Sequence, residues 1–152
     1  MKKIIISTLT LTLFTLTLHA QDISFGAGVG VGGDSKSVLK LPIDIDGEYR
    51  VEPEIALMSV DEGAGSDSSY SLGSGFYMLH KSSENTSLYY GAKAIFGDNL
   101  STQFSTEISA VAGFEYFMDS QVSLGAEASF GFGFGDVSGY ATDSSVNLRY
   151  YF

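Results

Sequence analysis

Residues 122–134 read VSLGAEASFGFGF, and an apolar side chain occupies every second position of this stretch. Glycine, serine or glutamate stands between the apolar residues. Residues 104–117, FSTEISAVAGFEYF, alternate in the same way and place both glutamates on one face. Because successive side chains of a β-strand point to opposite sides, a period of two predicts strands with one apolar and one polar face.

The same alternation recurs along the chain, and no segment shows a sustained helical period. Eight strands are predicted, over residues 23–31, 39–50, 54–60, 70–78, 88–96, 104–117, 122–134 and 146–152. The third is the most weakly phased, which leaves its facing open. Pro42 cannot donate a ladder hydrogen bond, so a bulge or an early strand start is expected there.

The predicted connections are of two kinds that take turns. Four are rich in Gly, Ser and Asp, as solvated loops are: 34–37, 61–69, 97–103 and 135–143. The other three are 51–53, 81–87 and 118–121. Seven connections leave both termini at the same end. The sequence therefore predicts an all-β fold, an eight-stranded antiparallel barrel in up-and-down meander order.

Charge distinguishes the two faces. The apolar face of the predicted strands carries no charged residue. The opposite face holds Lys40, Asp44, Asp46, Glu48, Arg50, Lys93, Glu107, Glu115, Glu127 and Arg149. A Lys or Arg facing lipid near the bilayer midplane costs about 2–4 kcal/mol, so a charge-free face suits a lipid-facing wall. The pattern favours a transmembrane barrel with a polar interior, and a soluble periplasmic β-protein with the faces reversed is the alternative.

The first twenty residues have the layout of an export signal. Lys2 and Lys3 are followed by a charge-free apolar stretch that ends at Ala20. This pattern predicts a cleaved signal peptide over residues 1–20, with the cut uncertain by a few positions, and a barrel domain over 21–152. The apolar stretch is shorter than the roughly 20 residues that a spanning helix needs.

The last seven residues, Val146-Asn147-Leu148-Arg149-Tyr150-Tyr151-Phe152, carry a resemblance. They resemble the C-terminal assembly signal of bacterial outer-membrane barrels, a terminal Phe preceded by apolar residues at alternate positions. Residues 21–152 resemble the small barrels of the OmpX, Ail and OmpA-transmembrane-domain kind. The resemblance implies a bacterial outer-membrane location, a monomer surrounded by lipid and lipopolysaccharide, and recognition by the barrel-assembly machinery through Val146, Leu148, Tyr150 and Phe152.

Composition excludes several classes of function. The chain has 152 residues and no cysteine, which rules out disulfides, thiolate metal sites and a cysteine nucleophile. Its net charge of −10 argues against nucleic-acid binding. No cofactor is predicted. Paired glycines such as Gly131 and Gly133 have the strand period, and no helix follows them as in a nucleotide-binding loop.

The polar face predicts an internal charge network of Lys93, Glu107, Glu115, Glu127 and Arg149. Eight strands enclose little more than packed side chains, so these groups are expected to form an ion-paired core. Acids outnumber bases on this face, which calls for a shared proton or cations from solution. A small conducting pore is the alternative.

Two further sites are weighed. His80-Lys81-Ser82 matches the His-x-Ser pair of lipid A deacylase barrels. These residues enter a predicted periplasmic turn, however, which favours an interfacial histidine over a lipid-modifying enzyme.

The predicted outer loops are acidic, with Lys36 as their counter-charge. Their carboxylates are those of Asp34, Asp61, Glu62, Asp67, Asp98, Asp136 and Asp143. Such a rim could hold divalent cations that bridge lipopolysaccharide, yet no loop has a calcium-motif spacing, and a solvated surface is favoured. The predicted function is a structural or surface-interaction role without catalysis.

Overall fold

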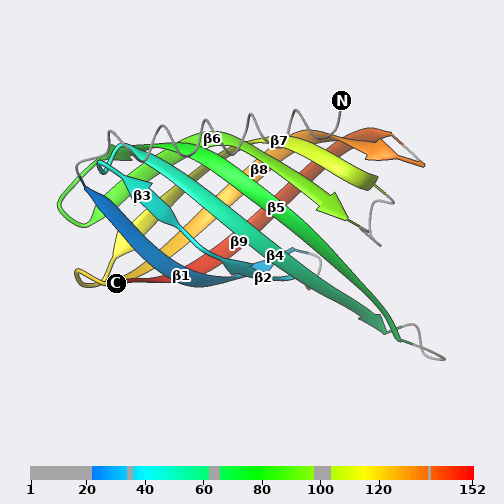
Figure 1. Ribbon diagram of the computed structural model, residues 1–152, viewed down its shortest axis with the longest axis horizontal. Helices are drawn as coiled ribbons and strands as arrows, with labels where there is room; N and C mark the ends of the chain where they lie inside the picture. Colours follow the sequence, from blue (N-terminus) through cyan, green and yellow to red (C-terminus); the bar gives the residue numbers. More distant parts are fainter. Residues whose placement is uncertain (1–21, 34–35, 62–65, 98–103, 137) are drawn as a thin grey trace.

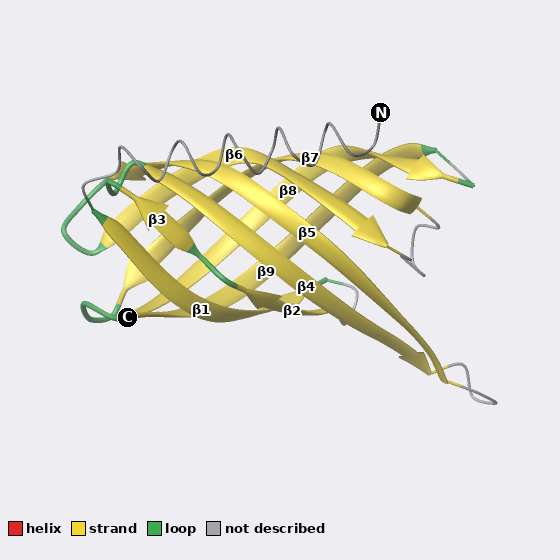
Figure 2. Cartoon of the chain, in the orientation of Figure 1, coloured by secondary structure: helices red, strands yellow, loops and turns green. Residues whose placement is uncertain are grey.

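A computed structural model describes residues 22–33, 36–61, 66–97, 104–136 and 138–152, and strands dominate them (Figure 2). Nine strands lie within these ranges: β1 (Ile23–Gly32), β2 (Ser37–Lys40), β3 (Ile43–Ile45), β4 (Tyr49–Asp61), β5 (Ser66–Lys81), β6 (Thr86–Gly97), β7 (Phe104–Phe117), β8 (Val122–Gly135) and β9 (Gly139–Tyr151). The described residues include no helix that is long and apolar enough to cross a membrane. The predicted signal peptide lies outside them.

The sheet closes on itself as an antiparallel barrel (Figure 1). Neighbours in sequence are neighbours in the sheet from β4 through to β9. The first and last strands then join, from Gly26 opposite Tyr151 to Gly32 opposite Ser145. Closure satisfies the strand edges, which a wall in contact with lipid requires.

The second predicted strand is interrupted at the proline. Strands β2 and β3 both pair with β1 on one side and with β4 on the other. The chain between them is held by bonds from Gly26 N to Pro42 O and from Leu41 N to Pro53 O, each 2.9 Å. Strands β2 and β3 are therefore two halves of one barrel strand, and the wall has the predicted eight strands and the expected irregularity at Pro42.

The predicted turn at residues 51–53 is wrong. The chain reverses at residues 46–48, where Asp46 and Gly47 adopt φ values of 55° and 66° and Glu48 N donates to Ile45 O. Asp-Gly is a preferred pair for hairpin turns because both residues tolerate positive φ. Strand β4 consequently begins at Tyr49, and its residues 51–53 lie within the sheet.

Two predicted outer loops are too long. Strand β9 already begins at Gly139, and Tyr140 pairs with Phe132, so most of the predicted loop 135–143 is strand. The Tyr140 ring stacks on Phe130 with centroids 5.7 Å apart. Strand β5 begins at Ser66 and pairs with β4 back to Asp61. This pairing makes the β4–β5 hairpin the longest projection of the barrel (Figure 1).

The barrel is inverted relative to a soluble protein. Large apolar side chains cover the outer wall, for example Val29 at 56% and Phe130 at 57% exposure, whereas Lys40, Arg50 and Arg149 are buried inside. The open question of the third predicted strand is settled by β4, where Ile55 and Leu57 face outward and Ala56 faces inward.

Aromatic side chains gather toward both ends of the outer wall, where they are exposed. At the end where β1 begins and β9 ends these are Tyr49, Tyr90, Tyr116, Tyr150 and Phe152, and at the opposite end Tyr70, Phe96, Phe134 and Tyr140. The side chain of Phe104, at the start of β7, lies outside the described residues. Such rings are typical of the two interfaces of a membrane barrel.

Candidate functional site

The candidate site is the interior of the barrel, because the charged side chains meet there. All five residues of the predicted network are buried: Lys93, Glu107, Glu115, Glu127 and Arg149. The strand period brings them inside from β6, β7, β8 and β9. Four of the five are joined by ion pairs, and Glu107 instead accepts a hydrogen bond from the Ser109 hydroxyl.

Arg50 organises the inner end of the lumen, which is the end where β1 begins and β9 ends. Its Nε lies 2.6 Å from Asp44 Oδ1, and its Nη2 lies 2.9 Å from Glu115 Oε2. The Tyr151 hydroxyl lies 2.6 Å from Arg50 Nη2 and donates to Glu115 Oε1 at 2.7 Å. Ser123 also donates to Glu115. Strands β3, β4, β7, β8 and β9 are thus linked through one guanidinium and one carboxylate.

Arg149 and Lys40 occupy the middle of the lumen. Arg149 Nε donates to Glu52 Oε2 at 2.9 Å, and Nη2 donates to Glu52 Oε1 at 3.2 Å. Lys40 Nζ lies 3.2 Å from Glu52 Oε1 and 2.8 Å from Glu127 Oε1. Tyr89 donates its hydroxyl hydrogen to Glu127 Oε2 at 3.1 Å. Two-pronged arginine–carboxylate contacts fix geometry as well as charge.

Lys93 lies between two carboxylates. Its Nζ is 3.7 Å from Glu54 Oε1 and 3.5 Å from Glu127 Oε1. Lys40 Nζ lies 3.8 Å from the other oxygen of Glu54. Glu54 is therefore held between two ammonium groups, and Glu127 links the Lys93 group of contacts to that of Arg149.

The sequence-based network omits four members. Glu52 was missed because the turn was placed over residues 51–53, and Glu54 was missed because the facing of the predicted strand 54–60 was left open. Lys40 and Arg50 were assigned to the polar face but not to the network. The Asp46-Gly47 pair was the signal that could have located the turn. It would have placed Glu52 in the same strand as Glu54, two positions away and therefore on the same face.

The charge count inside the barrel is close to balanced. Among the described residues, the buried bases are Lys40, Arg50, Lys93 and Arg149, and the buried glutamates are Glu52, Glu54, Glu107, Glu115 and Glu127. Asp44 is an additional partner of Arg50 with a side chain that is 15% exposed. Acids outnumber bases, as the sequence indicates. Breaking one such buried pair typically costs about 3–5 kcal/mol because it leaves an unpaired charge.

Aromatic rings fill the space between the ion pairs. Tyr77, Tyr89 and Val111 pack together inside the barrel. The guanidinium carbons of Arg50 and Arg149 lie 5.7 and 5.5 Å from the centroid of the Tyr89 ring. The ring lies over Gly113, where a Cβ would be 2.6 Å from the Tyr89 hydroxyl oxygen. The lumen is thus occupied by packed side chains.

The four residues of the predicted assembly signal lie along the outer wall of β9 and just after it. Val146, Leu148, Tyr150 and Phe152 are all exposed on the lipid-facing side. Phe152 N donates to Phe25 O at 2.9 Å, and the Phe152 ring contacts the Tyr150 ring with centroids 5.5 Å apart. Their assembly role stays a prediction.

The other predicted sites lie at the ends of the barrel. His80 is exposed near the inner end of β5, and the neighbouring Ser82 is also exposed. Asp143 lies in β9 and not in a loop. Of the predicted acidic rim, Asp34, Glu62 and Asp98 lie outside the described residues. No group of three or more histidine, aspartate or glutamate side chains within the described ranges is placed to hold a metal ion.

Comparison with known proteins identifies the architecture. The barrel superimposes on Neisserial surface protein A with a TM-score of 0.60 at 15% identity, over 86% of this chain and 96% of that one. It has the fold of a small outer-membrane barrel. The outer-membrane protein Ail of Yersinia pestis matches with a TM-score of 0.57 at 14% identity, over 86% of this chain and 100% of that one. A de novo designed transmembrane β-barrel matches at 0.51 and 15% identity, over 88% and 99%.

Neither a protein-family model nor a curated protein sequence matches the chain. The comparisons therefore bear on the fold, and they agree with the predicted resemblance to small outer-membrane barrels.

Proposed function

We propose that this protein is a bacterial outer-membrane barrel with a structural or surface-interaction role and no catalytic activity. One observation carries the proposal: across the described side chains, the closed barrel has an apolar outer wall without charged groups and an ion-paired interior. Such an arrangement gives the buried charged side chains ion-pair or hydrogen-bond partners and places the exposed apolar side chains in contact with lipid. In water, the same wall would be an exposed apolar surface far larger than soluble monomers carry.

The interior supports a closed barrel over a conducting pore. Arg50, Arg149, Tyr77 and Tyr89 fill the lumen, and none of them is more than 1% exposed. Their contacts bridge strands on different sides of the barrel, for example β9 to β4. An open water path would require several of these ion pairs to separate together.

The enzyme alternative receives little support from the geometry. His80 lies on the outward face of β5, opposite Leu88 of β6, and the described contacts give it no carboxylate or serine partner of a catalytic kind. A hydrolytic site needs a nucleophile and a base within hydrogen-bond reach of each other. His80→Ala with mass analysis of lipid A tests this alternative, and we expect unchanged lipid A.

The β4–β5 hairpin is the element that supports a surface-interaction role. Pairing from Leu57 with Tyr70 to Asp61 with Ser66 forms its outer part. Strand β2 stops pairing with β4 at Leu57, and β6 stops pairing with β5 at Ser71. Among the described residues, the outer hairpin is a two-stranded ribbon with an unpaired edge on each side, which is a surface that extended peptides can join.

Two measurements test the closed membrane barrel, and a third tests the surface role. Carbonate washing should leave the protein in the membrane fraction, and planar-bilayer recording of the purified protein should show no stable single-channel steps. Release by carbonate would identify a soluble β-protein. Stable conductance would contradict the closed barrel and support the pore alternative.

Deletion of residues 60–67 tests the surface role. The shortened protein should still insert into the membrane, and intact cells that carry it should lose any binding to a soluble protein.

A further inference from the structure

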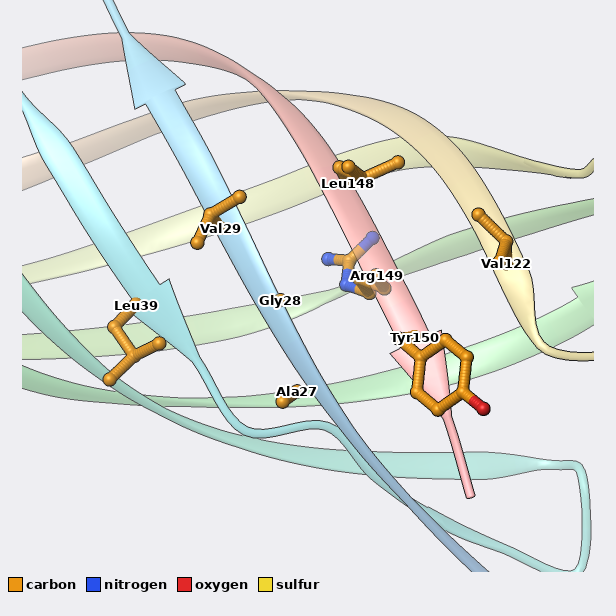
Figure 3. A pocket seen from close by; sticks show the side chains of 8 residues that line it. All are labelled: Ala27, Gly28, Val29, Leu39, Val122, Leu148, Arg149 and Tyr150. Carbon is orange, nitrogen blue, oxygen red and sulfur yellow. The ribbon is translucent and has the colours of Figure 1, made fainter.

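The outer wall has a depression at the closure of the barrel (Figure 3). Its volume is about 320 Å³. Outward side chains of four strands border it: Ala27, Val29, Leu39, Val122, Leu148 and Tyr150. Ala27 lies opposite Tyr150 in the β1–β9 ladder, and the smallness of its side chain beside that ring creates the hollow.

The depression is lined by hydrocarbon. The one polar group among the six bordering side chains is the Tyr150 hydroxyl, at the end of a ring that packs against Phe152. Val29, Leu39 and Leu148 are about half exposed and belong to the same wall that carries the exposed apolar residues. The hollow is therefore continuous with the lipid-facing surface. At about 300 Å³ it lies at the small end of ligand sites.

The depth of the hollow in the membrane follows from its position relative to the two ends of the barrel. Tyr150 is close to the C-terminus, and Val122 is the first residue of β8, directly after a short turn. Both termini and the short turns of outer-membrane barrels face the periplasm. The hollow thus opens on the inner leaflet, and Val29 and Leu39 lie further toward the midplane.

The rim below the hollow is acidic. Asp22 precedes β1 and Asp119 precedes β8, and both residues are exposed. Asp119 Oδ1 accepts bonds from the backbone N of Gln121 and Val122 at 2.7 Å, which fixes its position. The amino terminus that cleavage after Ala20 would create adds one positive charge, which still leaves a negative rim.

We propose that this hollow binds one acyl chain of an inner-leaflet phospholipid whose headgroup carries an ammonium group, as phosphatidylethanolamine does. The tail fills the space over Ala27, and the ammonium lies near the carboxylates of the rim. An anionic headgroup such as phosphatidylglycerol would be repelled by the same carboxylates. The inference rests on the outer-membrane role proposed above, because a soluble protein would present no wall to lipid.

The test is native mass spectrometry of the purified barrel after transfer from micelles containing equal amounts of phosphatidylethanolamine and phosphatidylglycerol with identical tails. Wild type should retain a single phosphatidylethanolamine. Ala27→Leu fills the hollow and should lose it. Ala112→Leu, a matched change at an exposed alanine of β7 outside the hollow, should keep it. Asp22→Asn should lower the preference for phosphatidylethanolamine over phosphatidylglycerol.

Several results would overturn the inference. These are equal retention by wild type and Ala27→Leu, no headgroup preference, retention of lipid A from the outer leaflet, or a dimer that Ala27→Leu dissociates. If Ala27→Leu fails to fold, Ala27→Val is used instead, because its smaller side chain fills part of the hollow. Every sample is first run unheated and boiled on a denaturing gel. A wild-type barrel that shifts on heating but retains no phospholipid contradicts the inference alone, and the absence of a shift contradicts the proposed function.

Discussion

The guanidinium of Arg149 on β9 donates two hydrogen bonds, of 2.9 and 3.2 Å, to the carboxylate of Glu52 on β4. Both side chains are fully buried. The two residues are 97 positions apart in the chain. The contact spans the lumen between strands that are not neighbours in the sheet. It therefore holds the barrel closed through its interior as well as through its wall.

Removal of the Arg149 charge should destabilise the barrel strongly. Arg149→Met leaves Glu52 buried without its main partner, at an expected cost of about 3–5 kcal/mol in the free energy of unfolding. Urea unfolding in lipid vesicles measures this cost. In a double-mutant cycle, Glu52→Gln combined with Arg149→Met should show a coupling of about 0.5–3 kcal/mol. Strictly additive effects would mean that the pair does not act as a unit.

Gly113 should resist substitution because the Tyr89 ring lies over it. In Gly113→Ala, the new Cβ would be 2.6 Å from the Tyr89 hydroxyl oxygen and 2.7 Å from Ala126 O. The overlap should cost about 1–3 kcal/mol. Gly33→Ala is the control, since no atom lies within 4 Å of its added Cβ, and it should change stability by less than about 0.5 kcal/mol. Equal effects of the two changes would contradict this packing.

The turn at Asp46-Gly47 should depend on glycine. Gly47 has a φ of 66°, a conformation that a side chain disfavours. Gly47→Ala should therefore lower the free energy of unfolding by about 1–2 kcal/mol. Nothing lies within 4 Å of an added Cβ at Gly47, so any loss of stability measures the backbone conformation and not a clash. An unchanged unfolding midpoint would rule out the left-handed turn.

Deletion of Phe152 should slow assembly more than it lowers stability. Phe152 is 77% exposed, and its ring contacts the Tyr150 ring. Membrane levels after a pulse of synthesis should fall for the deletion and recover in Phe152→Tyr, which keeps a terminal ring. The refolded proteins should unfold at similar urea concentrations. Normal membrane levels of the deleted chain would refute the assembly role.

Alternation in sequence was sufficient to predict which side of each clear strand faces lipid. Residues 122–134 show why, since lipid and a packed polar lumen require opposite chemistry at adjacent positions. The same period concealed the hairpin turn, because Gly47 continued the alternation of Ile43 and Ile45. A glycine matches either face of a strand, so only its pairing with Asp46 distinguished a turn from a strand.

The partners inside the lumen were beyond sequence analysis. The period placed Glu127 and Lys93 inside, and proximity of their charges was a reasonable expectation. The contact between Arg149 and Glu52 depends on the stagger that accumulates around the closed sheet, which no local pattern encodes. The hollow over Ala27 depends in the same way on which residue of β9 lies opposite it.

The most direct test of the account places a fluorescent probe on each side of the wall. The chain has no tryptophan, so one introduced residue reports its own surroundings. Phe76 faces outward and Tyr77, which follows it on β5, is fully buried inside. In vesicles of brominated phospholipid, Phe76→Trp fluorescence should be strongly quenched and Tyr77→Trp fluorescence little quenched. Tyr150→Trp and Tyr151→Trp form a second adjacent pair if Tyr77→Trp does not fold. Equal or reversed quenching in a barrel that still shifts on heating would contradict the lipid-facing wall.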